Sequence, residues 1–376
     1  MYKSEAVAAI TGSRHMGRIF SYGTILLFTV TTTKAVYAES SFDFYGHLNF
    51  GIFNVDDGAE SETYFTDNDV SNTRVGFNWA NDLGEGRGLR FNFETGVGLN
   101  GSSAVTIDDT DLEFQWDKRE LRKFELIYKT PDIGTFSFGQ GSTASDGVAE
   151  ADLSGTGVVA YSGIADLGGN IGFRDDADAL TGVTINGAFN NFDGGGRRFR
   201  LRYDTPSFQG LVFSVSAGQE VLKSGDDNEY YNAGAKYTAD YGDIKVDGRV
   251  GYSWVSGEDG LLAGSVAGLH VPTGLSIALS TGARQDDGEA DYYYIKLGWE
   301  QQWLDAGTTA LSVDYTDGSD YVFDGSDSES LGVAVVQNVD TYNLEIYASY
   351  RSFEFDSSGT EYQDIDLFVV GARWKF

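Results

Sequence analysis

The chain has 376 residues and a formal net charge of −31, from 26 Lys+Arg and 57 Asp+Glu. It contains no Cys, which excludes disulfides, thiolate metal sites and cysteine nucleophiles, and it lacks the Lys/Arg surplus that nucleic-acid binding needs. Aromatic residues make up 14% of the chain, too many for a disordered acidic polypeptide, and the 49 Gly, 25 Phe and 22 Tyr favour β-structure over helix.

The N-terminal segment has the features of a secretory signal. Ile19–Val30 is an apolar run that follows two arginines, and small residues precede a cleavage point after Ala38. The run is too short to span a membrane as a helix. We therefore expect a signal peptide over residues 1–38, cleaved after Ala38. Met16 offers a second translation start, and an uncleaved membrane anchor is the alternative.

The mature chain is dominated by a pattern of period two, in which apolar residues alternate with polar ones. Its net charge is −34, because the leader carries four basic residues and one acidic residue. The apolar members of four such runs are Leu89, Phe91 and Phe93; Phe199, Leu201 and Tyr203; Tyr293, Ile295, Leu297 and Trp299; and Leu311, Val313 and Tyr315. We expect strands with one apolar and one polar face, and no run is long enough for a membrane-spanning helix.

The connections between these runs alternate strictly between short ones and long, acidic ones. The short connections, which hold all three prolines, are Asn81–Gly88, Thr130–Gly134, Asp204–Gly210, Ala239–Gly242, Val271–Gly274, Gln302–Gly307 and Asn338–Asp340. The long ones are Asp56–Asp69, Asn100–Asp117, Gly141–Gly182, Gln219–Glu229, Ser256–Gly260, Gln285–Ala290, Asp317–Ser328 and Asp356–Glu361. About 16 strands of ~10 residues fit between them, and an even count with both termini at the short-connection end is typical of an outer-membrane barrel. The sequence therefore predicts one all-β domain over residues 39–376: a transmembrane antiparallel β-barrel with short periplasmic turns and long acidic extracellular loops.

The last strand carries a more specific signal. Phe368, Val370, Ala372, Trp374 and Phe376 occupy alternate positions and end in a C-terminal aromatic residue. Such a strand would face lipid, with its terminal ring at the membrane interface. It resembles the C-terminal strand by which outer-membrane barrels are recognised by their insertion machinery. An ordinary amphipathic terminal strand is the alternative.

Four segments together resemble the Gram-negative general diffusion porins, of the trimeric 16-stranded type. Phe42–Val55 is similar to the first strand of that family, Ser71–Trp79 to the second, Phe124–Gln140 to the strand-turn-strand before the constriction loop, and Ala372–Phe376 to the last strand. The resemblance spans the mature chain. It implies a homotrimer in the outer membrane of a Gram-negative bacterium, reached through the periplasm, with lipid and lipopolysaccharide as neighbours. Gln140 departs from the pattern, because the family usually has Arg or Lys there.

The resemblance also implies that the third long loop folds into the lumen and narrows it. The corresponding segment is Gly141–Gly182, in which Asp146, Glu150 and Asp152 are the expected acidic side of the constriction. A pore selects by its width and by the charges at its narrowest part. The alternative is an outer loop whose carboxylates face water.

A basic wall is expected opposite this loop. Arg198, Arg200 and Arg202 share one face of a strand whose other face is apolar, so they should point into the lumen. Arg74 and Arg90 are placed inward by the same alternation. Acidic loop and basic wall would set up a transverse field that orients dipolar solutes; the alternative is that the arginines only balance neighbouring wall carboxylates.

The remaining polar features do not define a site. Alternation is broken at Arg119, Arg122 and Lys123, so their faces are not predicted. No cofactor is expected, although Ca²⁺ could bind acidic loop segments; the candidates are Asp67–Asp69, Asp108–Asp111, Asp226–Asp227 and Asp324–Asp327. No nucleophile stands in a recognisable catalytic context, so we do not expect an enzyme.

The sequence thus favours a passive porin for small hydrophilic solutes and ions. A solute-specific porin, with Tyr292, Tyr294 and Trp116 as an aromatic slide for sugars, is the main alternative. A secreted or surface β-protein without a channel is a third. Two features have opposite effects on ion selectivity. The carboxylate excess attracts cations to the mouth of the pore, whereas the wall arginines favour anions. The size of that excess favours a weak cation preference.

Overall fold

A computed structural model describes residues 40–257, 260–285 and 290–376. The predicted signal peptide and the cleavage point after Ala38 lie outside the described residues. No helix in these ranges is long and apolar enough to cross a membrane.

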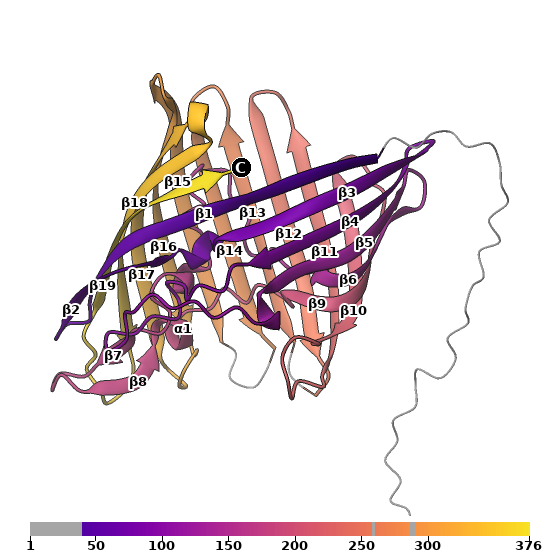
Figure 1. The fold of residues 1–376 in the computed structure, drawn as a ribbon. Helices are drawn as coiled ribbons and strands as arrows, with labels where there is room; N and C mark the ends of the chain where they lie inside the picture. The colour runs from indigo at the N-terminus through magenta and orange to yellow at the C-terminus, as the bar shows by residue number, and fades with distance from the viewer. Residues whose placement is uncertain (1–39, 258–259, 286–289) are drawn as a thin grey trace, which may run out of the picture. The chain divides into compact units, whose positions relative to one another are not determined.

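Strands form nearly all of the regular structure (Figure 1). They are β1 (Ser40–Asp56), β2 (Ser61–Asp67), β3 (Arg74–Gly84), β4 (Arg87–Gly96), β5 (Leu121–Thr130), β6 (Gly134–Ser142), β7 (Gly172–Arg174), β8 (Leu180–Thr184), β9 (Arg197–Asp204), β10 (Leu211–Gln219), β11 (Glu229–Asp240), β12 (Ile244–Val255), β13 (Leu261–His270), β14 (Leu275–Arg284), β15 (Asp291–Leu304), β16 (Gly307–Ser319), β17 (Asp327–Val339), β18 (Leu344–Asp356) and β19 (Ile365–Lys375). The short helices are α1 (Ile185–Ala188) and the 3-10 turns η1 (Asp69–Ser71), η2 (Lys118–Glu120), η3 (Ile164–Asp166) and η4 (Asp340–Tyr342).

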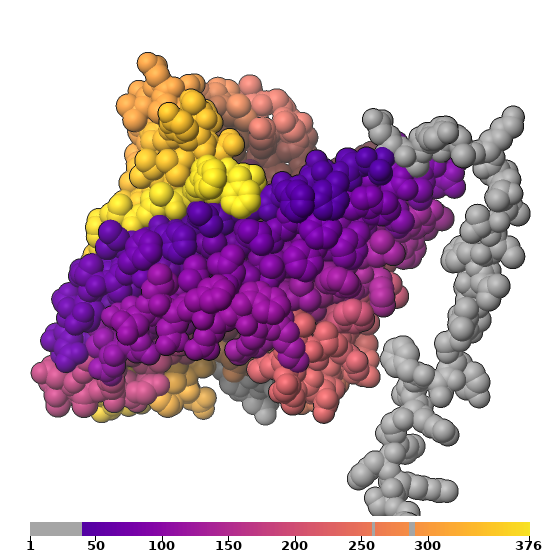
Figure 2. Space-filling model, in the orientation of Figure 1, coloured from indigo at the N-terminus to yellow at the C-terminus, as the bar shows by residue number. Residues whose placement is uncertain are grey.

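The sheet closes on itself. Neighbouring strands pair antiparallel in chain order, and β19 returns to pair with β1 from His47–Lys375 to Asp56–Asp366. Although the sheet has 17 strand segments, β2 and β3 follow each other along one side of β1, so the barrel has 16 positions. Closure removes the unpaired edges that lipid cannot satisfy. The predicted 16-stranded barrel is confirmed, and Figure 2 shows the C-terminal strand lying against the first one.

The outer surface is a band of lipid-facing side chains. On β9, Phe199 and Leu201 are 37% and 57% exposed, whereas Arg200 between them is 4% exposed. Exposed aromatic residues gather near the strand ends, as in the Trp299–Trp303 pair, whose ring centroids are 4.9 Å apart. The alternation predicted for these strands is therefore confirmed, with the apolar face outward.

Two of the predicted long connections have different bounds. Most of Asp56–Asp69 is strand, because β2 pairs with β1 and Tyr64 stacks on Phe53 at 5.4 Å, which leaves only residues 57–60 as a hairpin turn. The Gly141–Gly182 loop runs on to Gly196, since β9 begins at Arg197, and it contains β7, β8 and α1. Strand pairing and buried aromatic contacts overrode the acidic, Gly-rich composition in both segments.

The seam between the first and last strands depends on a glycine. The backbone of Gly46 exchanges two 3.0 Å hydrogen bonds with Phe376. A Cβ at Gly46 would lie 2.7 Å from the carbonyl oxygen of Arg74 and 2.7 Å from Cζ of Phe376. Phe376 can therefore pair with β1 at this position only because residue 46 has no side chain.

Gly46→Val is expected to lower the free energy of unfolding by about 1–3 kcal/mol, because the added methyl groups must push Phe376 off the seam. Heat-modifiable electrophoretic mobility of the folded barrel would measure this loss. Gly268→Val is the matched control, since a Cβ there meets no atom within 4 Å. Equal melting of the two variants would contradict the role of Gly46.

Candidate functional site

The loop from Thr143 to Gly196 lies against the inner wall, held by a row of serines. Ser216 Oγ accepts from the Ala144 amide at 2.9 Å. Further along, Ser265 Oγ donates to the Val148 carbonyl at 2.6 Å, and Ser280 Oγ donates to the Ala149 carbonyl at 2.7 Å. These serines occupy inward positions on β10, β13 and β14, so successive strands hold successive loop residues. Sequence reasoning missed them, although serine at alternate positions of several strands was the available signal.

A buried lysine fixes the middle of the loop. Lys296 on β15 is 1% exposed, and its ammonium donates to Asp152 at 2.8 Å and to the Ala160 carbonyl at 2.6 Å. Asp152, expected at the acidic side of the constriction, is therefore the ion-pair partner of a wall lysine. An ammonium this buried needs such partners, because an unpaired one would be costly.

The second half of the loop packs apolar side chains into the lumen. Buried residues of this half contact buried inward residues of β1 and β15–β19. They include Ile171, Phe173, Ile185 and Phe189 from the loop, and Phe53, Val55, Val336, Phe353, Phe355, Leu367 and Val369 from the wall. On this wall the expected pattern of one apolar and one polar face does not hold, because apolar side chains also point inward, where their burial against the loop holds it in place.

The same packing covers the two tyrosines that were predicted to contact sugars. Tyr292 and Tyr294 point inward but are only 1% and 4% exposed. The ring centroids of Tyr292 and the loop residue Phe192 are 6.1 Å apart, and the hydroxyls of Tyr292 and Ser280 share a hydrogen bond. Rings covered in this way cannot contact a passing sugar, so the prediction is wrong for the two tyrosines. Trp116, the third residue of the predicted slide, is 53% exposed.

Carboxylates gather where the start of the loop meets its end. Asp193 accepts backbone hydrogen bonds from Gly147 at 2.7 Å and Ala149 at 2.8 Å. Burial, reinforced by the charges of Asp193 and Asp146, raises the pKa of Glu150 to about 8. Burial also raises the pKa of Asp193 to about 6. Asp146 and Glu150 therefore share one acidic group within the loop, as the sequence suggested, and Asp193 joins it.

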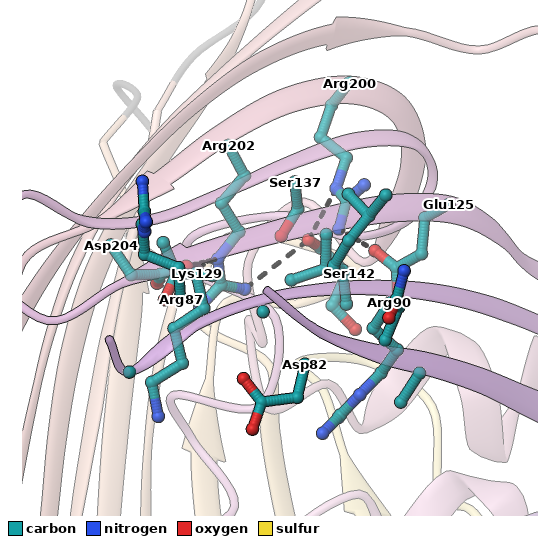
Figure 3. Close-up of a pocket in the computed structure, with 17 residues that line it drawn as sticks. Asp82, Arg87, Arg90, Glu125, Lys129, Ser137, Ser142, Arg200, Arg202 and Asp204 are labelled. Carbon is teal, nitrogen blue, oxygen red and sulfur yellow. Dashed lines mark hydrogen bonds and ion pairs between the residues drawn. The ribbon is translucent and has the colours of Figure 1, made fainter. Parts of the chain in front are cut away.

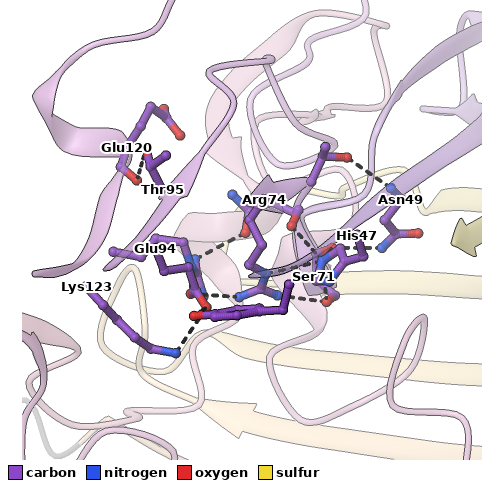
Figure 4. A network of polar contacts seen from close by, with 12 residues as sticks. His47, Asn49, Ser71, Arg74, Glu94, Thr95, Glu120 and Lys123 are labelled. Carbon is purple, nitrogen blue, oxygen red and sulfur yellow. Dashed lines mark hydrogen bonds and ion pairs between the residues drawn. The ribbon is translucent and has the colours of Figure 1, made fainter. Parts of the chain in front are cut away.

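Figure 4 shows the polar network on the facing wall. Arg74 contacts His47 Nε2 at 3.2 Å and Glu94 at 3.6 Å. Arg122 and Lys123 both reach Glu94, at 2.8 and 3.1 Å. They can do so because the β4–β5 register shifts at this point: Glu94 pairs with Lys123, and the next pair skips Arg122. This bulge explains why alternation gave no face for these residues.

This wall lies within electrostatic range of the loop carboxylates. Asp146 interacts with Arg122, and Asp166 interacts with both Arg122 and Arg197. Arg74 also interacts electrostatically with Arg122 and Arg197. Neither Arg122 nor Arg197 was among the predicted wall residues. Arg122 lies in the bulge, and Arg197 is the first residue of β9, directly after the loop. Loop carboxylates and wall arginines of opposite charge therefore interact with each other.

The three β9 arginines that the sequence placed in the lumen, Arg198, Arg200 and Arg202, point inward, but each has a carboxylate partner. Arg200 is buried and pairs with Glu125 at 2.5 Å. Arg202 pairs with Asp204 at 2.8 Å. Arg198 stands over the Tyr230 ring at 4.0 Å and reaches Glu220 at 3.6 Å. Arg90 faces the same interior nearer the short turns (Figure 3).

The remaining predicted residues are accounted for on the outer face or in loops. Phe368, Val370, Trp374 and Phe376 are exposed outward, at 42–50%, as expected for a lipid-facing last strand. Within the described ranges, no group of three or more His, Asp or Glu is arranged to hold a metal ion.

The comparisons with known proteins agree with this fold. The family model described as Gram-negative porin matches residues 24–358. No curated protein sequence matches the chain. An anion-selective porin from Comamonas acidovorans is 17% identical, with TM-score 0.59 over 90% of this chain and 100% of that one. OprB of Pseudomonas putida is 10% identical, with TM-score 0.58 over 89% and 94%. A trimer form of OmpT from Vibrio cholerae is 16% identical, with TM-score 0.55 over 90% and 99%.

The family model covers most of the chain, and the closed 16-stranded barrel is the fold of these structures. Family and fold point to a passive channel in the outer membrane of a Gram-negative bacterium, and to a channel rather than an enzyme. The chain therefore belongs to the Gram-negative porins.

Proposed function

We propose that small hydrophilic solutes and ions pass between the acidic first half of the loop and the basic wall, and that this gap is the constriction. The observation that carries the proposal is the opposition of charge: Asp146 and Asp166 on the loop interact with Arg122 on the wall. The apolar second half of the loop fills the other side of the lumen. Water and solutes are thereby confined to the charged side.

Charges at this gap should dominate selectivity over the distant extracellular loops, because the Debye length is ~8 Å at physiological ionic strength. One unit charge ~7 Å from a passing ion is worth about 0.6 kcal/mol in water, or roughly threefold in permeability. Asp146→Asn is expected to lower the K⁺/Cl⁻ permeability ratio by about that factor. Arg122→Gln should raise it by a similar factor.

Reversal potentials under a KCl gradient test both shifts. Asp305→Asn is the matched control, because it removes an exposed carboxylate in the short β15–β16 turn. Equal K⁺/Cl⁻ permeability ratios in wild type, Asp146→Asn and Arg122→Gln would show that the constriction lies elsewhere.

The pH dependence of selectivity follows from Glu150. With a pKa raised to about 8, chiefly by burial, this group is neutral below that pH and charged above it. Raising the pH from 7 to 9 is expected to add a negative charge and to increase the K⁺/Cl⁻ ratio by roughly threefold at ~7 Å. Asp193 titrates lower, with a pKa near 6, and an arginine such as Arg249 stays protonated over this pH range. Glu150→Gln should abolish the rise; an unchanged rise in that variant would assign it to another group.

We further propose a homotrimer, inserted by the barrel insertion machinery through the last strand and embedded among outer-membrane lipid and lipopolysaccharide. The solved trimer form of a structural neighbour supports the oligomeric state. Light scattering in detergent would measure it. The mature protein is proposed to begin after Ala38, which N-terminal sequencing would test.

A further inference from the structure

A second cavity opens in the inner wall, nearer the short turns than the loop. Its volume is about 660 Å³, and β3, β4, β5, β6 and β9 all contribute to its lining (Figure 3). In the figure, Arg200 and Arg202 lie on one side and Asp82 and Arg90 on the other. A solute that has passed the proposed constriction would meet this cavity on the periplasmic side.

The cavity has a local excess of positive charge in a strongly acidic chain. Two of its cations are already neutralised, because Arg200 pairs with Glu125 and Arg202 with Asp204. Those pairs are also fixed by carbonyl oxygens, such as that of Gly139, which accepts from Arg200 at 3.0 Å. They form a rigid polar rim with little net charge.

Arg90 and Lys129 are different. Both are exposed in the cavity, and among residues 40–257, 260–285 and 290–376 neither has an ion pair. Gly88, two residues before Arg90, pairs with Lys129 across β4 and β5, so the two cations are diagonal neighbours on one face. Diagonal neighbours lie ~7–8 Å apart, within reach of one anionic group for side chains this long.

An apolar floor adjoins these cations. Ile127 pairs directly with Arg90 on one side and with Ser137 on the other, and Ala80 borders the same cavity. A bare halide would leave this floor and most of the volume unused. Asp82 also lines the cavity, diagonal to Arg90, and is the one carboxylate of this lining without an ion pair among the described residues. Arg90 and Lys129 outnumber it, and two unpaired cations beside an apolar floor match a carboxylate joined to an apolar body.

We propose that this cavity is a subsite for organic carboxylates, in which Arg90 and Lys129 bind the carboxylate and Ile127 with Ala80 contacts the apolar part of the solute. The inference rests on the proposed channel function and adds a solute class to it. The subsite slows such anions on the periplasmic side without closing the pore to ions.

Benzoate is the probe, tested by single-channel recording in KCl. It is expected to reduce the conductance saturably, whereas benzyl alcohol, its neutral analogue, should have no effect and acetate a weaker one. The double variant Arg90→Gln/Lys129→Gln should raise the half-blocking benzoate concentration by about tenfold or more, since hydrogen bonds to charged groups are the strong ones. Ile127→Asn should reduce the preference for benzoate over acetate.

Lys245→Gln is the control, because it removes a cation of β12 that does not line the cavity. Current steps in KCl alone show for each variant that the barrel has folded. Normal KCl steps without benzoate block, or equal block in the double variant, would overturn the subsite and leave the channel intact. Equal block by benzyl alcohol would overturn the role of the cations. Absence of KCl steps from folded wild-type protein would instead refute the channel function.

Discussion

Replacing Arg200 by Met is expected to lower the free energy of unfolding by about 3–5 kcal/mol, because it leaves the Glu125 carboxylate buried without its partner. The side chains of Arg200 and Glu125 are 3% and 7% exposed. Asn92 offers that carboxylate only one neutral hydrogen bond, at 3.2 Å. Arg200 also donates to the carbonyls of Gly139 and Ser142, so the variant loses these side-chain hydrogen bonds between β9 and β6, while the backbone pairing of the two strands remains.

Thermal unfolding in detergent, read as the loss of heat-modifiable mobility, measures the effect. Arg202→Met is the matched control, because its side chain is 23% exposed and its pair with Asp204 should be worth much less. The double variant Arg200→Met/Glu125→Gln should recover much of the loss, since no buried charge remains. Equal melting of Arg200→Met and Arg202→Met would contradict this ranking.

Lys296→Met should loosen the loop rather than the barrel. It removes the ammonium that joins β15 to Asp152 and to the Ala160 carbonyl. Breaking a buried pair costs about 3–5 kcal/mol, which would raise the undocked population of the loop by more than about 100-fold. Single-channel records should then show larger and noisier conductance levels than wild type.

The apolar packing of the second half of the loop limits how far it can move. The expected signature of Lys296→Met is therefore fluctuation between levels, not one permanently wide pore. Lys245→Met, which alters a β12 lysine that takes no part in this ion pair, serves as the control. Quiet, wild-type levels in Lys296→Met would show that the lysine does not hold the loop.

The parts of the fold that follow from period-two alternation were predictable. The inward arginines and outward Phe199 and Leu201 of β9 obey the rule, because lipid contacts one face and water the other. The bulge at Arg122 broke the rule, since an extra residue in one strand has no signature in sequence alone. The strand β2 was hidden because its acidic residues resemble those of a loop.

The site was predictable only in outline. Asp146 and Glu150 could be located from the family resemblance. The carboxylate partners of Arg198, Arg200 and Arg202 could not, because they come from other strands and loops. Apolar residues such as Phe53 and Leu367 face inward against the usual pattern of a porin wall, and only the path of the loop explains them. Long-range packing of the loop set these contacts, and no local pattern encodes them.

The most direct test of the account is the single-channel conductance of the purified protein in a planar bilayer, with the reversal potential read under a KCl gradient. We expect ion-conducting steps that come in groups of three, with a K⁺/Cl⁻ permeability ratio that falls in Asp146→Asn and rises in Arg122→Gln. Folded protein that inserts into the bilayer without conducting would contradict an open path between the acidic loop and the basic wall.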